Sequence, residues 1–253
     1  MKIFLRQLAY VGSATELIGI FVRDLFKYKL EWPEIKLQCQ QIGLYSMPLA
    51  GITLLFVGFV FAYQFGLSMA TLGATPYIGK LVSLSVVREL GPAFTALVVG
   101  GRIGSGMAAE IGSMKVTEQI DAIRALGGSP YPKLLIPRVI AATFMLPVLT
   151  VISSFIAILG GMLIAWTEFK LSPLAFYQSS LQTVSFNDFC SGFFKPFFFG
   201  FGTAIIGCLQ GFRCETGTAG VGKATTQAVV NISLTVVFFD FLLTRLFNQI
   251  WPH

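Results

Sequence analysis

Long apolar runs separated by short polar segments dominate this chain. No Asp, Glu, Lys or Arg lies between Lys36 and Lys80, and residues 43–67 are densely apolar. The other apolar runs cover residues 90–114, 139–167, 193–212 and 229–250. Each run has about 20 residues or more, enough to cross roughly 30 Å of hydrocarbon at about 1.5 Å per residue. The pattern predicts five transmembrane helices.

The first 36 residues mix apolar and charged positions. Apolar residues recur there at helical spacing, namely Leu17, Ile20, Phe21 and Leu25. Basic residues occupy the other face, namely Arg23, Lys27 and Lys29. We expect residues 1–36 to form an amphipathic helix, or a pair of helices, lying in the membrane interface. A sixth span is the alternative, and the charge density argues against it. Residues 37–253 then form the transmembrane bundle of a single, all-α domain.

The composition agrees with a polytopic membrane protein. Hydrophobic residues make up 55% of the chain and charged residues only 12%, about half the usual share of a soluble domain. A net charge of +6 would suggest nucleic acid for a soluble protein, but here the basic residues lie between the apolar runs. With the N-terminus in the cytoplasm, 13 of the 18 Lys and Arg residues fall on the inner side. This bias predicts a cytoplasmic N-terminus and a periplasmic C-terminus.

The sequence offers little for catalysis or for metal binding. The four cysteines are scattered without a CxxC pair, and His253 is the only histidine. Residues 217–225, GTAGVGKAT, approach the phosphate-binding pattern GxxxxGK[ST], but Ala224 stands where a hydroxyl must reach magnesium. We therefore expect a non-catalytic chain that binds no metal, cofactor or ATP, with these residues forming a cytoplasmic loop.

A short amphipathic helix is predicted between the second and third spans, within residues 112–128, GSMKVTEQIDAIRALGG. Thr117 is the candidate N-cap, Ile120 and Ile123 share an apolar face, and Gly127 and Gly128 end the helix after about three turns. Three charged residues lie on another face: Glu118, Asp121 and Arg124. Two interpretations remain open, a solvated loop helix and a coupling helix that docks into a groove of a partner.

Residues 88–127, RELGPAFTALVVGGRIGSGMAAEIGSMKVTEQIDAIRALG, and residues 220–230, GVGKATTQAVV, resemble the MlaE/YrbE family of ABC-transporter permeases. The resemblance covers nearly the whole chain. It implies a homodimer in the bacterial inner membrane, with a cytoplasmic MlaF-like ATPase that binds ATP and Mg. It also implies a periplasmic MlaD-like MCE protein and a small MlaB-like STAS-domain subunit. The implied activity is phospholipid movement between inner and outer membrane, which supports outer-membrane lipid asymmetry.

The resemblance also implies roles for three groups of residues. The ATPase-coupling group is Thr117, Glu118, Ile120, Asp121, Ile123 and Arg124. The lipid-pathway group is Arg88, Glu89 and Leu90, for which an interfacial anchor is the alternative. The transmission group is Arg102, Glu110 and Lys115, for which a static salt-bridge network is the alternative.

Two other classes of function remain alternatives to an ABC permease. A stand-alone secondary transporter or channel needs ionisable residues along an intramembrane path, and Asp240, Arg102 and Glu110 are the candidates. A non-transporting membrane scaffold needs no such path. For Asp240 we expect a charged partner on another helix, because an unpaired carboxylate in lipid is costly.

Overall fold

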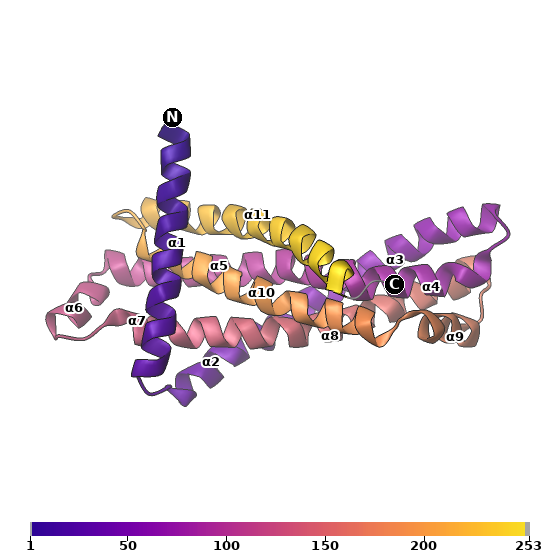
Figure 1. Cartoon of the computed structure of the whole chain (residues 1–253), viewed down its shortest axis with the longest axis horizontal. Coiled ribbons are helices and arrows are strands. Elements are labelled where there is room, and N and C mark those ends of the chain that lie inside the picture. Colours follow the sequence, from indigo (N-terminus) through magenta and orange to yellow (C-terminus); the bar gives the residue numbers. More distant parts are fainter. Residues whose placement is uncertain (1, 251–253) are drawn as a thin grey trace. The chain divides into compact units, whose positions relative to one another are not determined.

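Helices make up all the regular structure of the part that the computed structural model describes, residues 2–250 (Figure 1). In chain order the α-helices are α1 (Lys2–Lys27), α2 (Trp32–Gly43), α3 (Met47–Thr71), α4 (Ile78–Ser85), α5 (Gly91–Val116), α6 (Gln119–Ala125), α7 (Pro130–Leu134), α8 (Ile136–Phe169), α9 (Pro173–Thr183), α10 (Phe186–Phe212) and α11 (Thr218–Ile250). A 3₁₀ turn, η1 (Thr75–Tyr77), precedes α4, and a π-helical turn, η2 (Val86–Leu90), joins α4 to α5. The predicted all-α fold is confirmed.

Within the described residues, five helical segments are long and apolar enough to cross a membrane. They are Trp32–Thr71, Thr75–Val116, Pro130–Phe169, Phe186–Phe212 and Thr218–Ile250. This agrees with the five predicted spans, and α1 is not among these segments. The chain is a multi-pass membrane protein.

Two predicted boundaries were wrong. The second span begins well before residue 90, because α4 and η2 continue directly into α5. Lys80 and Arg88 interrupt the apolar run in the sequence without ending the helix. Residues 218–225 are the first turns of α11 rather than a loop, and the turn before them is made by Gly217, which has a φ of +86°.

The chain divides into two compact units, which are described separately. The first comprises Met1–Ile42, Gly100–Met145 and Phe199–Thr235; the second comprises Gly43–Val99, Leu146–Phe198 and Val236–His253. In the first unit α1 lies against α7 (Figure 1), and Leu17, Phe21 and Asp24 are buried among its residues 12–27. The Asp24 carboxylate raises the pKa of the exposed Arg23, first by accepting a hydrogen bond at 2.9 Å and then by its charge.

Small residues bring helices of the first unit into close contact. A Cβ added at Gly207 of α10 would lie 2.8 Å from the carbonyl oxygen of Gly104 in α5. A Cβ added at Gly104 would lie 2.0 Å from Ile232 Cδ1 in α11. Close approach through small residues is how helices pack in lipid. The hydrophobic effect does not drive helices together there, because the lipid tails are themselves apolar.

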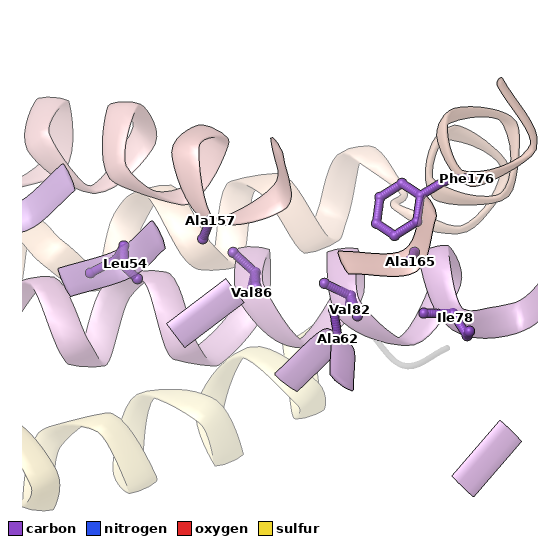
Figure 2. Packing of buried hydrophobic residues seen from close by; sticks show 8 residues of the cluster. All are labelled: Leu54, Ala62, Ile78, Val82, Val86, Ala157, Ala165 and Phe176. Atoms are coloured by element: carbon purple, nitrogen blue, oxygen red, sulfur yellow. The ribbon is translucent and has the colours of Figure 1, made fainter. Parts of the chain in front are cut away.

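The core of the second unit follows the same rule. Figure 2 shows eight buried side chains from α3, α4, η2, α8 and α9: Leu54, Ala62, Ile78, Val82, Val86, Ala157, Ala165 and Phe176. Beside them, a Cβ at Gly58 of α3 would lie 2.0 Å from the Ala157 carbonyl oxygen in α8. Phe176, on α9 next to α4, is the largest of the eight and is almost fully buried. These contacts hold the helices around η2.

Candidate functional site

The π-helical turn η2 carries two of the predicted site residues, Arg88 and Glu89. The Gly91 N–H bonds to the Val86 carbonyl, five residues earlier, which is the π pattern. Pro92 has no N–H, so it cannot donate to the carbonyl of Arg88 as an α-helix would require. That carbonyl instead accepts a hydrogen bond from Lys195 Nζ at 3.0 Å. Single π turns inside α-helices are frequent at functional sites.

Lys195 of α10 is the centre of a charged cluster. Its side chain has no exposed surface, and its Nζ lies 2.5 Å from Glu89 Oε2 and 3.4 Å from Asp240 Oδ1. It also donates to Thr244 Oγ1 at 2.7 Å, and Thr244 in turn donates to Glu89 Oε2 at 3.0 Å. A buried ammonium needs this many partners, because an ion taken out of water without them is very costly. Asp240 therefore has the charged partner on another helix that we expected.

Arg88 belongs to the same cluster and contacts side chains near the start of α10 and near the end of α11. Its guanidinium lies 3.3 Å from Asp188 Oδ1 and donates to the side-chain oxygen of Asn248 in α11. Asp188 also accepts hydrogen bonds from the Ser185 N–H at 2.9 Å and from Ser185 Oγ at 2.7 Å, at the start of α10. We call Arg88, Glu89, Asp188, Lys195, Asp240, Thr244 and Asn248 the η2 cluster.

The predicted lipid-pathway residues therefore divide. Arg88 and Glu89 are both members of the η2 cluster, whereas Leu90 packs against the hydrophobic residues of Figure 2. The side chains of Arg88 and Glu89 are only 18% and 37% exposed and lie within a continuous helical segment. An interfacial anchor, the alternative for these two residues, would instead place their charged groups in water at the end of a helix. Sequence reasoning missed Lys195 as their partner; its isolated charge in an apolar run just before Pro196 was the available signal.

The predicted short helix is α6, with two corrections. It spans seven residues, Gln119–Ala125, or about two turns rather than three. Thr117 is not its N-cap, because the Thr117 hydroxyl bonds back to the Ser113 carbonyl at 2.9 Å and so completes the end of α5. Glu118 is the N-cap instead, in a left-handed conformation with φ +59°.

The end and the faces of α6 agree with the sequence pattern. Gly127, with φ +77°, ends the helix, and the Gly128 N–H bonds to the Ile123 carbonyl at 3.0 Å. Ile120 is buried and Ile123 half-buried. The other face is exposed and carries Glu118 together with Asp121 and Arg124, which form an ion pair at 3.2 Å. Pro130 then opens the short helix α7.

The transmission residues occupy three different environments along α5. Glu110 pairs with Arg138 of α8 at 2.8 Å, and Arg138 also donates to the Leu134 carbonyl at the end of α7 at 2.6 Å. Lys115 donates to the Phe212 carbonyl at the end of α10 at 2.8 Å. Arg102 is exposed on α5. Glu110 and Lys115 thus tie α5 to two other helices close to the segment that carries α6.

We expect Glu110→Ala to destabilise the protein more than Arg138→Met, although Glu110 is the more exposed partner. Removing Glu110 leaves the buried Arg138 cation without its counter-ion, which costs about 3 kcal/mol. Removing Arg138 leaves the Glu110 carboxylate, which is 51% exposed and can be solvated by water. The expected loss of stability is therefore only about 1–2 kcal/mol. The measurement is the free energy of unfolding of each variant in the same detergent. Lys133→Met, on the surface of α7, is the control. A larger loss for Arg138→Met would contradict this ranking.

Among residues 2–250, no three His, Cys, Asp or Glu side chains lie close enough together to hold a metal ion. The η2 cluster itself offers charged groups of both signs. Arg88 is a planar donor suited to phosphate or carboxylate, and Glu89 is an acceptor suited to an ammonium group. The apolar helices around them suit a ligand with a charged head and hydrocarbon chains.

Comparison with known proteins places this geometry in context. A family model described as Permease MlaE matches residues 35–246. A probable ABC transporter permease of Synechocystis is 42% identical over 212 residues, covering 84% of this chain and 81% of that protein. A probable ABC transporter permease of Rickettsia typhi is 38% identical over 240 residues, covering 92% and 93%. The chloroplastic protein TRIGALACTOSYLDIACYLGLYCEROL 1 of Arabidopsis thaliana is 34% identical over 237 residues, covering 94% and 68%.

Proposed function

Because the chain belongs to the MlaE permease family of ABC transporters, we propose that it moves phospholipids between the inner and outer membranes of a bacterium. The resemblance of residues 88–127 and 220–230 to this family is confirmed by the family match. The chain is an ABC transporter permease, and such a permease implies an ATPase partner. The stand-alone transporter and the scaffold lose their support, because neither explains membership of this family.

The η2 cluster is the observation that carries the lipid proposal. Ionisable side chains inside membrane spans are expensive and usually mark the path of a substrate. Here two cations and three carboxylates gather in helices that are otherwise apolar. Glu89 and Asp240 keep part of their surface exposed, so a ligand can reach them. In this proposal Arg88 binds the phosphate of the headgroup and Glu89 binds a headgroup amine, while Leu90 beside them packs against the core of the second unit.

Coupling to ATP hydrolysis is proposed to run through α6. Its exposed charges Glu118, Asp121 and Arg124 contact a cytoplasmic MlaF-like ATPase, while Ile120 and Ile123 fix the helix to the permease. The pairs Glu110–Arg138 and Lys115–Phe212 transmit the movement into α5 and its neighbours. The helix α5 runs from Gly91, next to η2, to Val116, close to α6, so one continuous helix connects the two proposed sites along the chain.

The remaining assignments of the proposal concern the assembly. The permease is a homodimer in the inner membrane, with a cytoplasmic N-terminus and a periplasmic C-terminus, and α1 lies in the membrane interface. An ATPase on each protomer holds ATP and Mg, and this chain holds no cofactor. The periplasmic partner is an MlaD-like MCE protein, and a small MlaB-like STAS-domain subunit joins the ATPase.

The test is phospholipid transfer by the co-expressed complex after reconstitution. We expect the permease to retain an ATPase, to carry extractable phospholipid and to transfer it to acceptor membranes only with ATP. Arg88→Gln is expected to lower transfer about tenfold through loss of a charge-assisted hydrogen bond, while Lys80→Gln on the exposed side of α4 leaves it unchanged. A complex that hydrolyses ATP but carries and transfers no phospholipid would overturn the proposed substrate.

A further inference from the structure

An apolar pocket, open on one side, lies directly beside η2 in the second unit. It has a volume of about 220 Å³ and is lined by side chains from η2, α8 and α10. Val87 contributes from η2, Thr150, Val151 and Phe155 from α8, and Phe189 and Phe193 from α10. Its lining is almost entirely apolar. We call this space the η2 cavity.

The backbone contact between η2 and α10 explains why the cavity has fixed walls. A Cβ at Gly192 would lie 2.0 Å from the Val87 carbonyl oxygen, so only glycine allows the two backbones to meet there. Phe189 and Phe193 are four residues apart on α10, on either side of Gly192 in the sequence. Their rings stack with centroids 6.0 Å apart and an angle of 12° between the ring planes. The cavity is thus a built feature of η2 and α10.

The cavity and the η2 cluster use neighbouring residues of the same two helices. Val87 lines the cavity and Arg88 follows it in the chain, while Phe189 lines the cavity and follows Asp188. An apolar space next to Arg88, to which we assign the headgroup phosphate, suits one molecule with both kinds of group. In a membrane protein, phospholipid is the ligand of that chemistry present in the surrounding solvent.

Thr150 supplies a polar contact inside this apolar lining. It is 3% exposed, and its Oγ1 has no hydrogen-bond partner among the described residues. The neighbouring hydroxyl of Ser153 is satisfied by Thr95 Oγ1 at 2.8 Å and by the Leu149 carbonyl at 2.7 Å. A buried hydroxyl without a partner costs free energy that a ligand oxygen can recover. The Thr150 hydroxyl can donate to the carbonyl of an ester, a group that a diacyl phospholipid carries at the root of each chain.

We propose that the η2 cavity binds one acyl chain of the transported phospholipid, with the Thr150 hydroxyl donating to an ester carbonyl. This inference rests on the proposed function and deepens it, because it assigns a chain-binding subsite to a single protomer. Each permease chain then holds its own acyl subsite within the second unit. The charged head lies towards the η2 cluster.

The test uses the complete complex in nanodiscs containing a phosphatidylethanolamine with a diazirine in one acyl chain. After illumination, mass spectrometry locates the labelled residues. Two variants probe the cavity: Val151→Trp fills it from α8, and Thr150→Val removes only the hydroxyl. Val148→Trp is the matched control, because Val148 lies one turn earlier on α8, is similarly exposed and does not line the cavity.

We expect labelling to concentrate on Phe155, Phe189 and Phe193 in the unmodified complex. Val151→Trp should lower it about tenfold, and Thr150→Val about threefold, the effect of one neutral hydrogen bond. Val148→Trp should change it less than twofold. Equal labelling along the whole exposed side of α8, unchanged by Val151→Trp, would mean contact with bulk lipid only and would overturn the inference. If Val151→Trp does not assemble, the nearly isosteric Thr150→Val decides, and unchanged labelling there overturns the role of the hydroxyl.

ATP-dependent lipid transfer, measured on the same samples, separates this inference from the function on which it rests. Transfer without cavity labelling removes the subsite and leaves the function. Cavity labelling without any transfer removes the proposed function and leaves a lipid-binding site.

Discussion

Replacing Lys195 by methionine is expected to lower the free energy of unfolding by about 3 kcal/mol, the lower end of the range for a broken buried ion pair. Methionine is similar in length and unbranched, so it fits the space that the fully buried lysine occupies. The loss arises because Glu89 and Asp240 then face each other without a cation. The lower end applies because both carboxylates retain some exposure and can be partly solvated. Unfolding of the detergent-solubilised protein measures the change.

The decisive control neutralises the whole group. Lys195→Met combined with Glu89→Gln and Asp240→Asn should regain most of the lost stability, because no uncompensated charge remains. Phospholipid transfer should stay impaired in this triple variant, since it lacks the Glu89 carboxylate that the proposal assigns to a headgroup amine. Lys80→Met, at an exposed position of α4, should leave both quantities unchanged. A single Lys195→Met variant as stable as the unmodified protein would show that the ammonium is not the counter-ion.

Reversing two charges on α6, with Glu118→Lys and Asp121→Lys together, is expected to release the ATPase from the purified complex. Both side chains are exposed, so the permease itself should fold normally. Lysine at 118 meets the same left-handed backbone as glutamate, so the substitution adds no new strain there. The new charges would repel the basic groups that the proposed contact requires on the partner. Co-purification and ATP hydrolysis are the measurements.

A double variant with the same change in charge provides the comparison. Glu16→Lys on α1 and Glu168→Lys near the end of α8 are both exposed and lie outside α6. This pair should keep the ATPase bound. Retention of the ATPase by the α6 variant would show that α6 is a solvated loop helix and that docking occurs elsewhere.

The sequence predicts the five spans well because lipid imposes a simple rule. Every backbone polar group in the hydrocarbon must be bonded within the helix, so each span shows as a long apolar run. The runs at residues 139–167 and 229–250 lie inside α8 and α11. The glycine end of α6 was also predictable, because Gly127 adopts a backbone conformation that other residues avoid.

The errors have one common cause, which is that local patterns do not show tertiary partners. Lys80 and Arg88 suggested the end of a hydrophobic segment, but Arg88 is bonded to Asp188 and Asn248, far away in the sequence. Thr117 suggested a helix start, but its hydroxyl prefers the carbonyl of the preceding helix. The π turn could be suspected from Pro92, which frees a carbonyl four residues earlier, yet nothing local identifies Lys195 as the donor that reaches it.

The π turn also sets the rotational phase between α4 and α5. A π turn contains one residue more than a turn of the α-helix. In an α-helix, each residue corresponds to about 100° of rotation around the axis. Deleting a single residue from 86–90 would therefore turn every side chain of α4 by roughly that angle relative to α5. The buried face of α4, with Ile78 and Val82, would leave its neighbours. The number of residues in this turn is thus fixed by the packing of α4 against α3 and α9.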